Sequence, residues 1–237
     1  MMALLLRRRE ALHRNPEPGK PVTNGMRLLC LLFLGAVSAL PQSFSFGVKA
    51  GVPLTDFFST VQSPRFGFNS NTKRYIVGPM VQLGLPAGFA LEFDALYRRL
   101  NYESRLTLVD VFTNSRTTGN AWEFPLLLKY RFHAPLVRPY VGGGVAWDTL
   151  SGLKQSVTNT ILPGRTTTTT TSNPAELQNT NTVGAVAVAG IDVHALFLHI
   201  SPEVRYTYWG TQHFRDAVSG LLHSNRNQAE FLVGFTF

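Results

Sequence analysis

The chain has 237 residues, of which 44% are hydrophobic and 15% are charged, and its formal net charge is +8. No apolar run reaches the roughly 18–20 residues of a membrane-spanning helix, and a single cysteine cannot form an intrachain disulfide. Because 17 Phe, 7 Tyr and 3 Trp are too many for a long disordered chain, the composition indicates a folded, β-rich protein.

The N-terminus has the layout of a targeting segment. Residues 26–39 contain an apolar stretch that ends in small residues, which is typical of a signal peptide cut after Ala39. Residues 1–25 are either an upstream extension ahead of a true start at Met26 or an unusually long basic n-region. Cys30 lies inside the apolar stretch, whereas a lipobox cysteine would follow it, so the sequence does not indicate a lipoprotein.

Removal of this segment changes the charge balance. Residues 1–39 hold six Lys/Arg and two Asp/Glu, which leaves 16 basic and 12 acidic residues, a net charge of +4, in residues 40–237. This remaining domain has no cysteine, which suits an oxidising compartment such as the periplasm. It also has no basic cluster beyond isolated pairs, so we expect no nucleic-acid partner.

Eight segments of residues 40–237 alternate apolar and polar residues with a period of two, the pattern of a β-strand. Each is about nine to eleven residues long, which is the length that a tilted strand needs to cross a bilayer. The fifth segment is rich in glycine, and its phase is ambiguous. The segments span residues 44–52, 75–85, 89–98, 122–132, 139–147, 183–193, 198–208 and 229–237.

The connections between these segments alternate in length. Those after the second, fourth and sixth segments are short, and the others run from about 16 to 35 residues. This alternation is the layout of an outer-membrane barrel, with short periplasmic turns and long extracellular loops. We expect Thr166–Thr171 to be a solvated, mobile loop with no fold of its own. A hairpin within residues 60–68 would make a ten-stranded variant, which the sequence leaves open.

One phase of the segments is apolar and often aromatic, and the other carries the charges. Eight strips of large apolar side chains would overfill the narrow lumen of an eight-stranded barrel, so we expect them to face lipid. The charged phase then faces inward as a network of ion pairs, in which closure of the barrel brings Glu230 near Lys49. The predicted lumen residues are Lys49, Glu92, Asp94, Arg98, Glu123, Lys129, Arg131, Glu203, Arg205 and Glu230.

The C-terminus places an apolar residue at every second position before a terminal phenylalanine: Phe231, Val233, Phe235 and Phe237. This ending resembles the signal that the assembly machinery of outer-membrane barrels reads. Three further stretches, 122–130, 138–144 and 201–206, resemble the small bacterial outer-membrane barrel family typified by the OmpA transmembrane domain and by OmpX. The resemblance covers about residues 42–237.

The resemblance implies an all-β, eight-stranded, antiparallel, up-and-down transmembrane barrel in the outer membrane. Its expected partners are the lipid bilayer, the barrel-assembly machinery through the C-terminal strand, and an extracellular ligand at the loops; we expect a monomer. The leading function is a structural or surface-interaction role. The alternative is a narrow porin-like channel for small solutes, against which the charged lumen argues.

A catalytic role is a third alternative. His199 and Ser201, with Glu203 as a third group, resemble the site of outer-membrane lipid A deacylases, and a histidine activates a serine in this way. The pair lies near the periplasmic turn, however, whereas lipid A is in the outer leaflet, so we expect no enzyme activity. The histidines show no spacing typical of a metal site, so we expect no metal and no cofactor.

Overall fold

The alternating segments form long antiparallel strands in a computed structural model of the chain. It describes residues 43–60, 66–70, 74–107, 110–135, 137–161, 163–195, 198–214 and 222–237. The expected N-terminal extension, 1–25, and signal peptide, 26–39, lie outside the described residues. No helix in the described part is long and apolar enough to cross a membrane.

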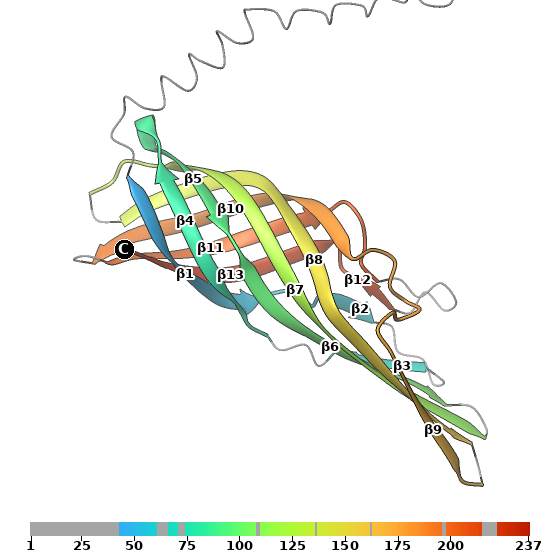
Figure 1. The fold of residues 1–237 in the computed structure, drawn as a ribbon. Helices are drawn as coiled ribbons and strands as arrows, with labels where there is room; N and C mark the ends of the chain where they lie inside the picture. Colours follow the sequence, from blue (N-terminus) through green and yellow to red (C-terminus); the bar gives the residue numbers. More distant parts are fainter. Residues whose placement is uncertain are drawn as a thin grey trace, which may run out of the picture. The chain divides into compact units, whose positions relative to one another are not determined.

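The described elements are almost all strands, shown in chain order in Figure 1. They are β1 (Phe44–Pro53), β2 (Phe58–Thr60), β3 (Phe66–Ser70), β4 (Ile76–Gly84), the short 3-10 turn η1 (Pro86–Gly88), β5 (Phe89–Asp94), β6 (Leu96–Thr107), β7 (Val111–Arg131), β8 (Val137–Ile161), β9 (Arg165–Thr171), β10 (Asn181–Ala195), β11 (Leu198–Trp209), β12 (Leu222–Ser224) and β13 (Asn227–Thr236).

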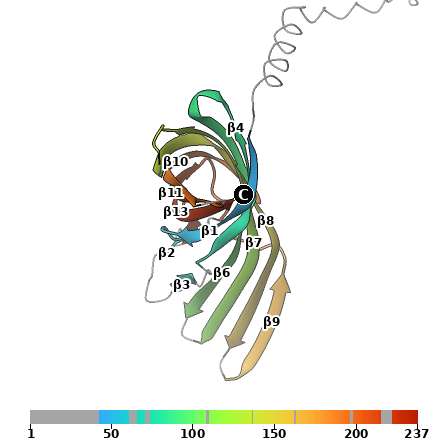
Figure 2. The same ribbon diagram turned by 90° about the vertical axis from the view of Figure 1, so that its left-hand side faces the viewer.

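Eight strand positions close into a ring, which Figure 2 shows nearly end-on. β1 pairs with β4 on one side and with β13 on the other, so the first and last strands seal the wall. The ring continues through β5 and β6, which together form one wall strand, then β7, β8, β10 and β11 back to β13. Every pairing is antiparallel, so the predicted eight-stranded, up-and-down barrel is confirmed.

The barrel buries charge and exposes apolar side chains. Lys49 and Arg205 are 0% exposed, whereas Phe46 is 62% exposed and Leu128 is 48% exposed. A barrel surrounded by water would have the opposite distribution, because apolar area is stabilised by removal from water. An apolar outer wall with a polar interior suits lipid, and ring closure pairs the backbone groups that hydrocarbon would leave unsatisfied.

The Gly-rich fifth segment has a definite phase in β8. Tyr140, Ala146 and Asp148 are buried, whereas Val145 and Trp147 are exposed on the outer face. Even-numbered residues of this segment therefore face the lumen, and the glycines let the neighbouring backbone approach closely. A Cβ atom at position 144 would collide with the main-chain oxygen of Leu126 on β7, next to its register partner.

Three ring strands, β6, β7 and β8, continue past the barrel at the end opposite the short turns, and β9 pairs beside β8 there. β7 and β8 have 21 and 25 residues, about twice what a bilayer crossing needs, and with β6 and β9 they form the projecting sheet in Figure 1. The prediction that Thr166–Thr171 has no fold of its own is therefore wrong: β9 pairs with β8 from Ile161↔Arg165 to Gln155↔Thr171. Gly164, in the left-handed region with φ of 143°, forms the turn between them.

Threonine favours strands, and cross-strand hydroxyl contacts add to the pairing. Three such contacts of 3.2–3.4 Å join the β8–β9 hairpin, for example between Thr158 and Thr168.

The short strands near the same end add nothing to the ring. β2 pairs with β12 and β3 pairs with β6, so the described residues do not form the extra wall hairpin of a ten-stranded variant.

Candidate functional site

The centre of the barrel interior is organised around the carboxylate of Glu203 on β11. Lys49 from β1 approaches one carboxylate oxygen at 3.0 Å, and Lys129 from β7 approaches the other at 2.7 Å. Arg205, two residues along the same strand, lies 2.8 Å from the first oxygen. The hydroxyl of Tyr140 donates a fourth hydrogen bond at 2.8 Å. Glu203 therefore joins strands from opposite parts of the wall.

Glu92 and Asp94 on β5 complete this central cluster. Glu92 lies 2.6 Å from Lys49 and 2.7 Å from Lys129, and Asp94 lies 2.7 Å from Arg205. All of these side chains are buried. Because each cation faces two or more carboxylates, its charge is compensated within the low-dielectric interior, where an unpaired charge is strongly destabilising.

A second cluster, centred on Arg98 of β6, lies nearer the long-loop end. Its guanidinium is 2.9 Å from Asp148, 3.2 Å from Glu230 and 3.8 Å from Glu123. The expected approach of Glu230 to Lys49 is wrong, because the register pairs Lys49 with Gly234 and puts Glu230 four residues further along β13.

Among the buried polar residues that the sequence analysis did not assign to the lumen are Tyr140, Asp148 and Asp192. Tyr140 and Asp148 lie on the Gly-rich strand whose phase the sequence left ambiguous, so no alternation assigned them to the lumen. The two clusters together hold more acid than base, since four cations, Lys49, Arg98, Lys129 and Arg205, face six carboxylates: Glu92, Asp94, Glu123, Asp148, Glu203 and Glu230.

An apolar cluster of buried residues lies beyond Arg98, toward the long-loop end. The ring of Phe57, from the loop after β1, lies under the Arg98 guanidinium at 4.8 Å and stacks on His213 at 6.2 Å. Phe214, 0% exposed, meets Tyr102 edge-on at 5.6 Å. The backbone N–H groups of His213 and Phe214 both donate to the hydroxyl of the buried Ser224, the last residue of β12. We call this cluster, with Leu100, Ala121, Leu150 and Leu153, the apolar cap.

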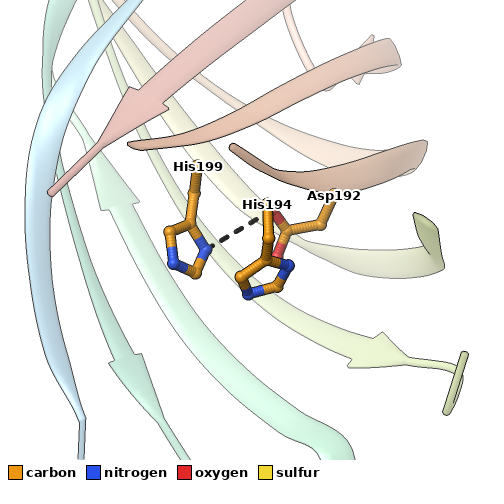
Figure 3. Close-up of side chains that lie close together, drawn as sticks. All are labelled: Asp192, His194 and His199. Carbon is orange, nitrogen blue, oxygen red and sulfur yellow. Dashed lines mark ion pairs between the residues drawn. The ribbon is translucent and has the colours of Figure 1, made fainter. Parts of the chain in front are cut away.

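The short-turn end of the lumen carries a different group of side chains. Asp192 and His194 from β10 and His199 from β11 lie together there, as Figure 3 shows. His199 Nδ1 is 3.7 Å from Asp192 Oδ1, and the hydroxyl of Ser201 donates to the same oxygen at 3.2 Å. Arg131 is also one of the predicted lumen residues. Its Nε atom lies 3.6 Å from Oδ2 of Asp192.

The position of Asp192 concerns the candidate catalytic pair, His199 and Ser201. His199 and Ser201 both face Asp192, whereas Glu203 is engaged by Lys49 and Lys129 in the central cluster. The carboxylate beside the pair is thus Asp192, which the sequence analysis did not single out.

A family model described as "Outer membrane protein beta-barrel domain" matches residues 28–237. The chain belongs to this family. Membership places the protein in the outer membrane, so the short-turn end of this outer-membrane barrel faces the periplasm and the long-loop end the exterior.

The chain is also similar to several solved structures. Neisserial surface protein A is 14% identical, with 83% of this chain and 98% of that chain covered and a TM-score of 0.35. OprG of Pseudomonas aeruginosa is 13% identical, with coverage of 82% and 93% and a TM-score of 0.44. The N-terminal barrel domain of Pseudomonas aeruginosa OprF is 16% identical, with coverage of 81% and 97% and a TM-score of 0.32. No curated protein matches the chain by sequence.

The C-terminal strand of the outer-membrane barrel has its aromatic side chains on the outer face. Phe231, Phe235 and Phe237 are exposed and Val233 is partly exposed. The backbone N–H of Phe237 donates to the carbonyl of Phe46 at 3.1 Å, beside the seam between β13 and β1. Three of the four residues predicted as an assembly signal therefore lie on β13, whose pairing closes the ring, and Phe237 directly follows it.

Proposed function

We propose that this outer-membrane barrel is a non-conducting structural protein whose projecting strands serve surface interaction. The observation that supports the proposal is the buried interior: the ion-pair clusters lie within the lumen, and the apolar cap lies toward its long-loop end. An eight-stranded barrel has a lumen just wide enough for side chains, so two such layers leave little room for solute.

The central ion-pair cluster also makes the barrel rigid. Glu203 contacts cations from three strands, so any widening of the lumen separates opposite charges in a low-dielectric interior. A pore with this lining would have to break that network for each passing solute. The charge pattern therefore favours a permanent plug over a gate.

The interaction surface in this proposal is the projecting sheet of β6 to β9. At about 3.3 Å per residue, the 25 residues of β8 extend far beyond the roughly 25 Å apolar band of an outer-membrane barrel. The β8–β9 hairpin is largely exposed and carries threonines on both faces. Hydroxyl-bearing strands offer hydrogen bonds and free backbone edges to an extracellular ligand.

The proposal includes the route to the membrane. The chain is exported by the signal peptide at residues 26–39, and the assembly machinery inserts it as a monomer by reading Phe231, Val233, Phe235 and Phe237. N-terminal sequencing of the protein from outer membranes tests the first step, and a start near residue 40 is expected. A protein that retains residues 26–39 would contradict export by this signal.

Planar-bilayer recording tests the absence of conduction. The refolded barrel, inserted beside a reconstituted porin as a positive control, is expected to give no reproducible unitary steps. Stable steps of uniform size would refute the plug and favour the narrow channel. A fold check by gel mobility before reconstitution ensures that silence does not come from unfolded protein.

A hairpin deletion separates the two parts of the proposed role. Removing residues 156–171 shortens the projecting sheet, where 156–161 pair with β7, and leaves the pairing of β8 with β10 and the rest of its pairing with β7 in place. We expect cells with this variant to keep their resistance to detergents but to bind less to surfaces that the wild type binds. Unchanged surface binding would contradict the interaction role, and lost detergent resistance would assign the hairpin to membrane support.

A further inference from the structure

The β10–β11 turn brings two histidines into direct opposition. His194 and His199 are register partners, and their ring centroids are 3.9 Å apart at an interplanar angle of 61°. Side chains at every second position of a strand share a face, so Asp192 lies on the same face as His194. The five-residue separation of the histidines in the sequence hides this proximity, which depends on the hairpin register.

The three side chains offer a compact set of metal-ligand atoms. One ligand atom from each of Asp192, His194 and His199 lies within 4.8 Å of the others, and the Asp192–His199 pair is already at 3.7 Å. Ligands at 2.0–2.2 Å from a tetrahedral ion are roughly 3.3–3.6 Å apart, so modest side-chain rotations would seat one ion. His194 is exposed and His199 is half-buried, so both rings are free to make that adjustment.

The carboxylate is already oriented for such a role. Asp192 is 2% exposed, Arg131 holds its Oδ2 atom, and the Ser201 hydroxyl approaches its Oδ1 atom, the one that faces His199. Outer partners of this kind fix the direction of a metal-binding carboxylate.

We propose that Asp192, His194 and His199 bind one divalent transition-metal ion, of the Zn²⁺ class, at the periplasmic mouth of the lumen. Two imidazoles and one carboxylate form a ligand set that suits zinc, and the remaining position is left to water. His194 faces the periplasm, so the ion enters from that side without crossing the central cluster. Because its ligands come from two neighbouring strands, the bound ion ties β10 to β11 across their turn.

Calorimetric titration of the refolded full-length protein with ZnCl₂ tests the site. The protein is prepared without a polyhistidine tag, and heat-dependent gel mobility verifies the fold of every variant. The wild type is expected to bind one Zn²⁺ per chain, and His194→Ala and His199→Ala each to weaken binding at least tenfold. The matched control is His133→Ala, because His133 is an exposed histidine of another periplasmic turn outside the cluster.

Two further readouts bear on the same site. Bound Co²⁺ in place of Zn²⁺ is expected to show visible absorption that His194→Ala abolishes. Saturating Zn²⁺ is expected to raise the temperature at which the wild-type barrel loses its folded gel mobility, and to leave that of the His194→Ala variant unchanged.

Several results would overturn the proposal. The proposal fails if the wild type binds no Zn²⁺, or if it binds several Zn²⁺ ions per chain weakly and with equal affinity. It also fails if the His194→Ala variant binds Zn²⁺ as tightly as the wild type. An equal loss in the His133 control would also overturn it. His194 is exposed, so its substitution is expected to leave the fold intact even if Asp192→Asn does not. Conductance and surface binding are measured separately, so a failure here is distinct from a failure of the proposed function.

Discussion

Glu203→Gln is the substitution that probes the central ion-pair cluster most directly. It keeps the shape of the side chain and removes a charge that Lys49, Lys129 and Arg205 approach within 2.7–3.0 Å. The amide also brings a donor group next to these three cations, which have hydrogens of their own and no lone pair to accept it.

The expected loss of stability follows from the carboxylates that remain in the central cluster after the substitution. Glu92 and Asp94 are left to compensate three buried cations in the central cluster. Removal of one partner from a buried ion pair destabilises a protein by about 3–5 kcal/mol, because the other charge stays buried without compensation. We therefore expect Glu203→Gln to lower the free energy of unfolding by that amount.

Glu123→Gln is the matched control, because it removes the same charge from the same interior. The nearest cation to Glu123 is the Arg98 guanidinium at 3.8 Å, and that group keeps Asp148 at 2.9 Å and Glu230 at 3.2 Å. Carboxylates already outnumber cations in the interior. We expect Glu123→Gln to change the free energy of unfolding by less than about 1 kcal/mol, or to raise it slightly.

Urea unfolding of the refolded barrel in lipid vesicles, followed by the fluorescence of its three tryptophans, measures both variants. The account predicts a clear loss of stability for Glu203→Gln alone. Equal losses of unfolding free energy in the two variants, or no loss in either, would refute the reasoning. The reasoning is that the ion-pair contacts of a lumen carboxylate decide how much its removal destabilises the barrel.

Three further predictions concern other parts of the barrel. Glu230→Ala, which leaves Arg98 with fewer partners, is expected to lower the urea midpoint more than Thr168→Ala in the projecting hairpin; an unchanged midpoint would remove Glu230 from the network. Leu126→Arg puts a charge midway along the lipid face and is expected to cost about 2–4 kcal/mol in vesicles, whereas a neutral effect would argue against lipid contact there. Deletion of Phe237 is expected to slow membrane insertion in cells and to leave refolding in detergent unaffected; normal insertion would count against the assembly signal.

The barrel was predictable because its strands carry a strong period of two. Charges at Lys49, Glu92, Lys129 and Arg205 share one phase with small or polar neighbours, and large apolar residues occupy the other. Since that phase decides which side chains enter the lumen, the inward placement followed before any pairing was known. The pairing itself did not follow, because it depends on strand register, and Glu230 contacts Arg98 instead of Lys49 for that reason.

Two features of the fold could not be predicted from the sequence because the local composition was misleading. The threonine run at 166–171 has the low complexity of a loop, yet threonine suits strands, and the partner strand β8 supplies the pairing that a single segment lacks. The Gly-rich stretch of β8 hid the phase of Asp148, because glycine carries no polarity signal.

The cluster of Asp192, His194 and His199 depends on long side chains that meet across a tight turn. A scan for spacing along one strand cannot find such a cluster. A signal was present, however, in two histidines placed symmetrically about a short connection. Testing register partners across every predicted hairpin would have brought them together.

Gel mobility of the purified protein in SDS, boiled against unboiled, tests the central claim that this chain forms a closed barrel with an apolar outer wall. The ring closed by β1 and β13 predicts that the unboiled barrel stays folded and runs at a different apparent mass from the boiled chain. Identical mobilities, from a sample shown to be folded before SDS was added, would contradict the closed barrel and the inward placement of its charges.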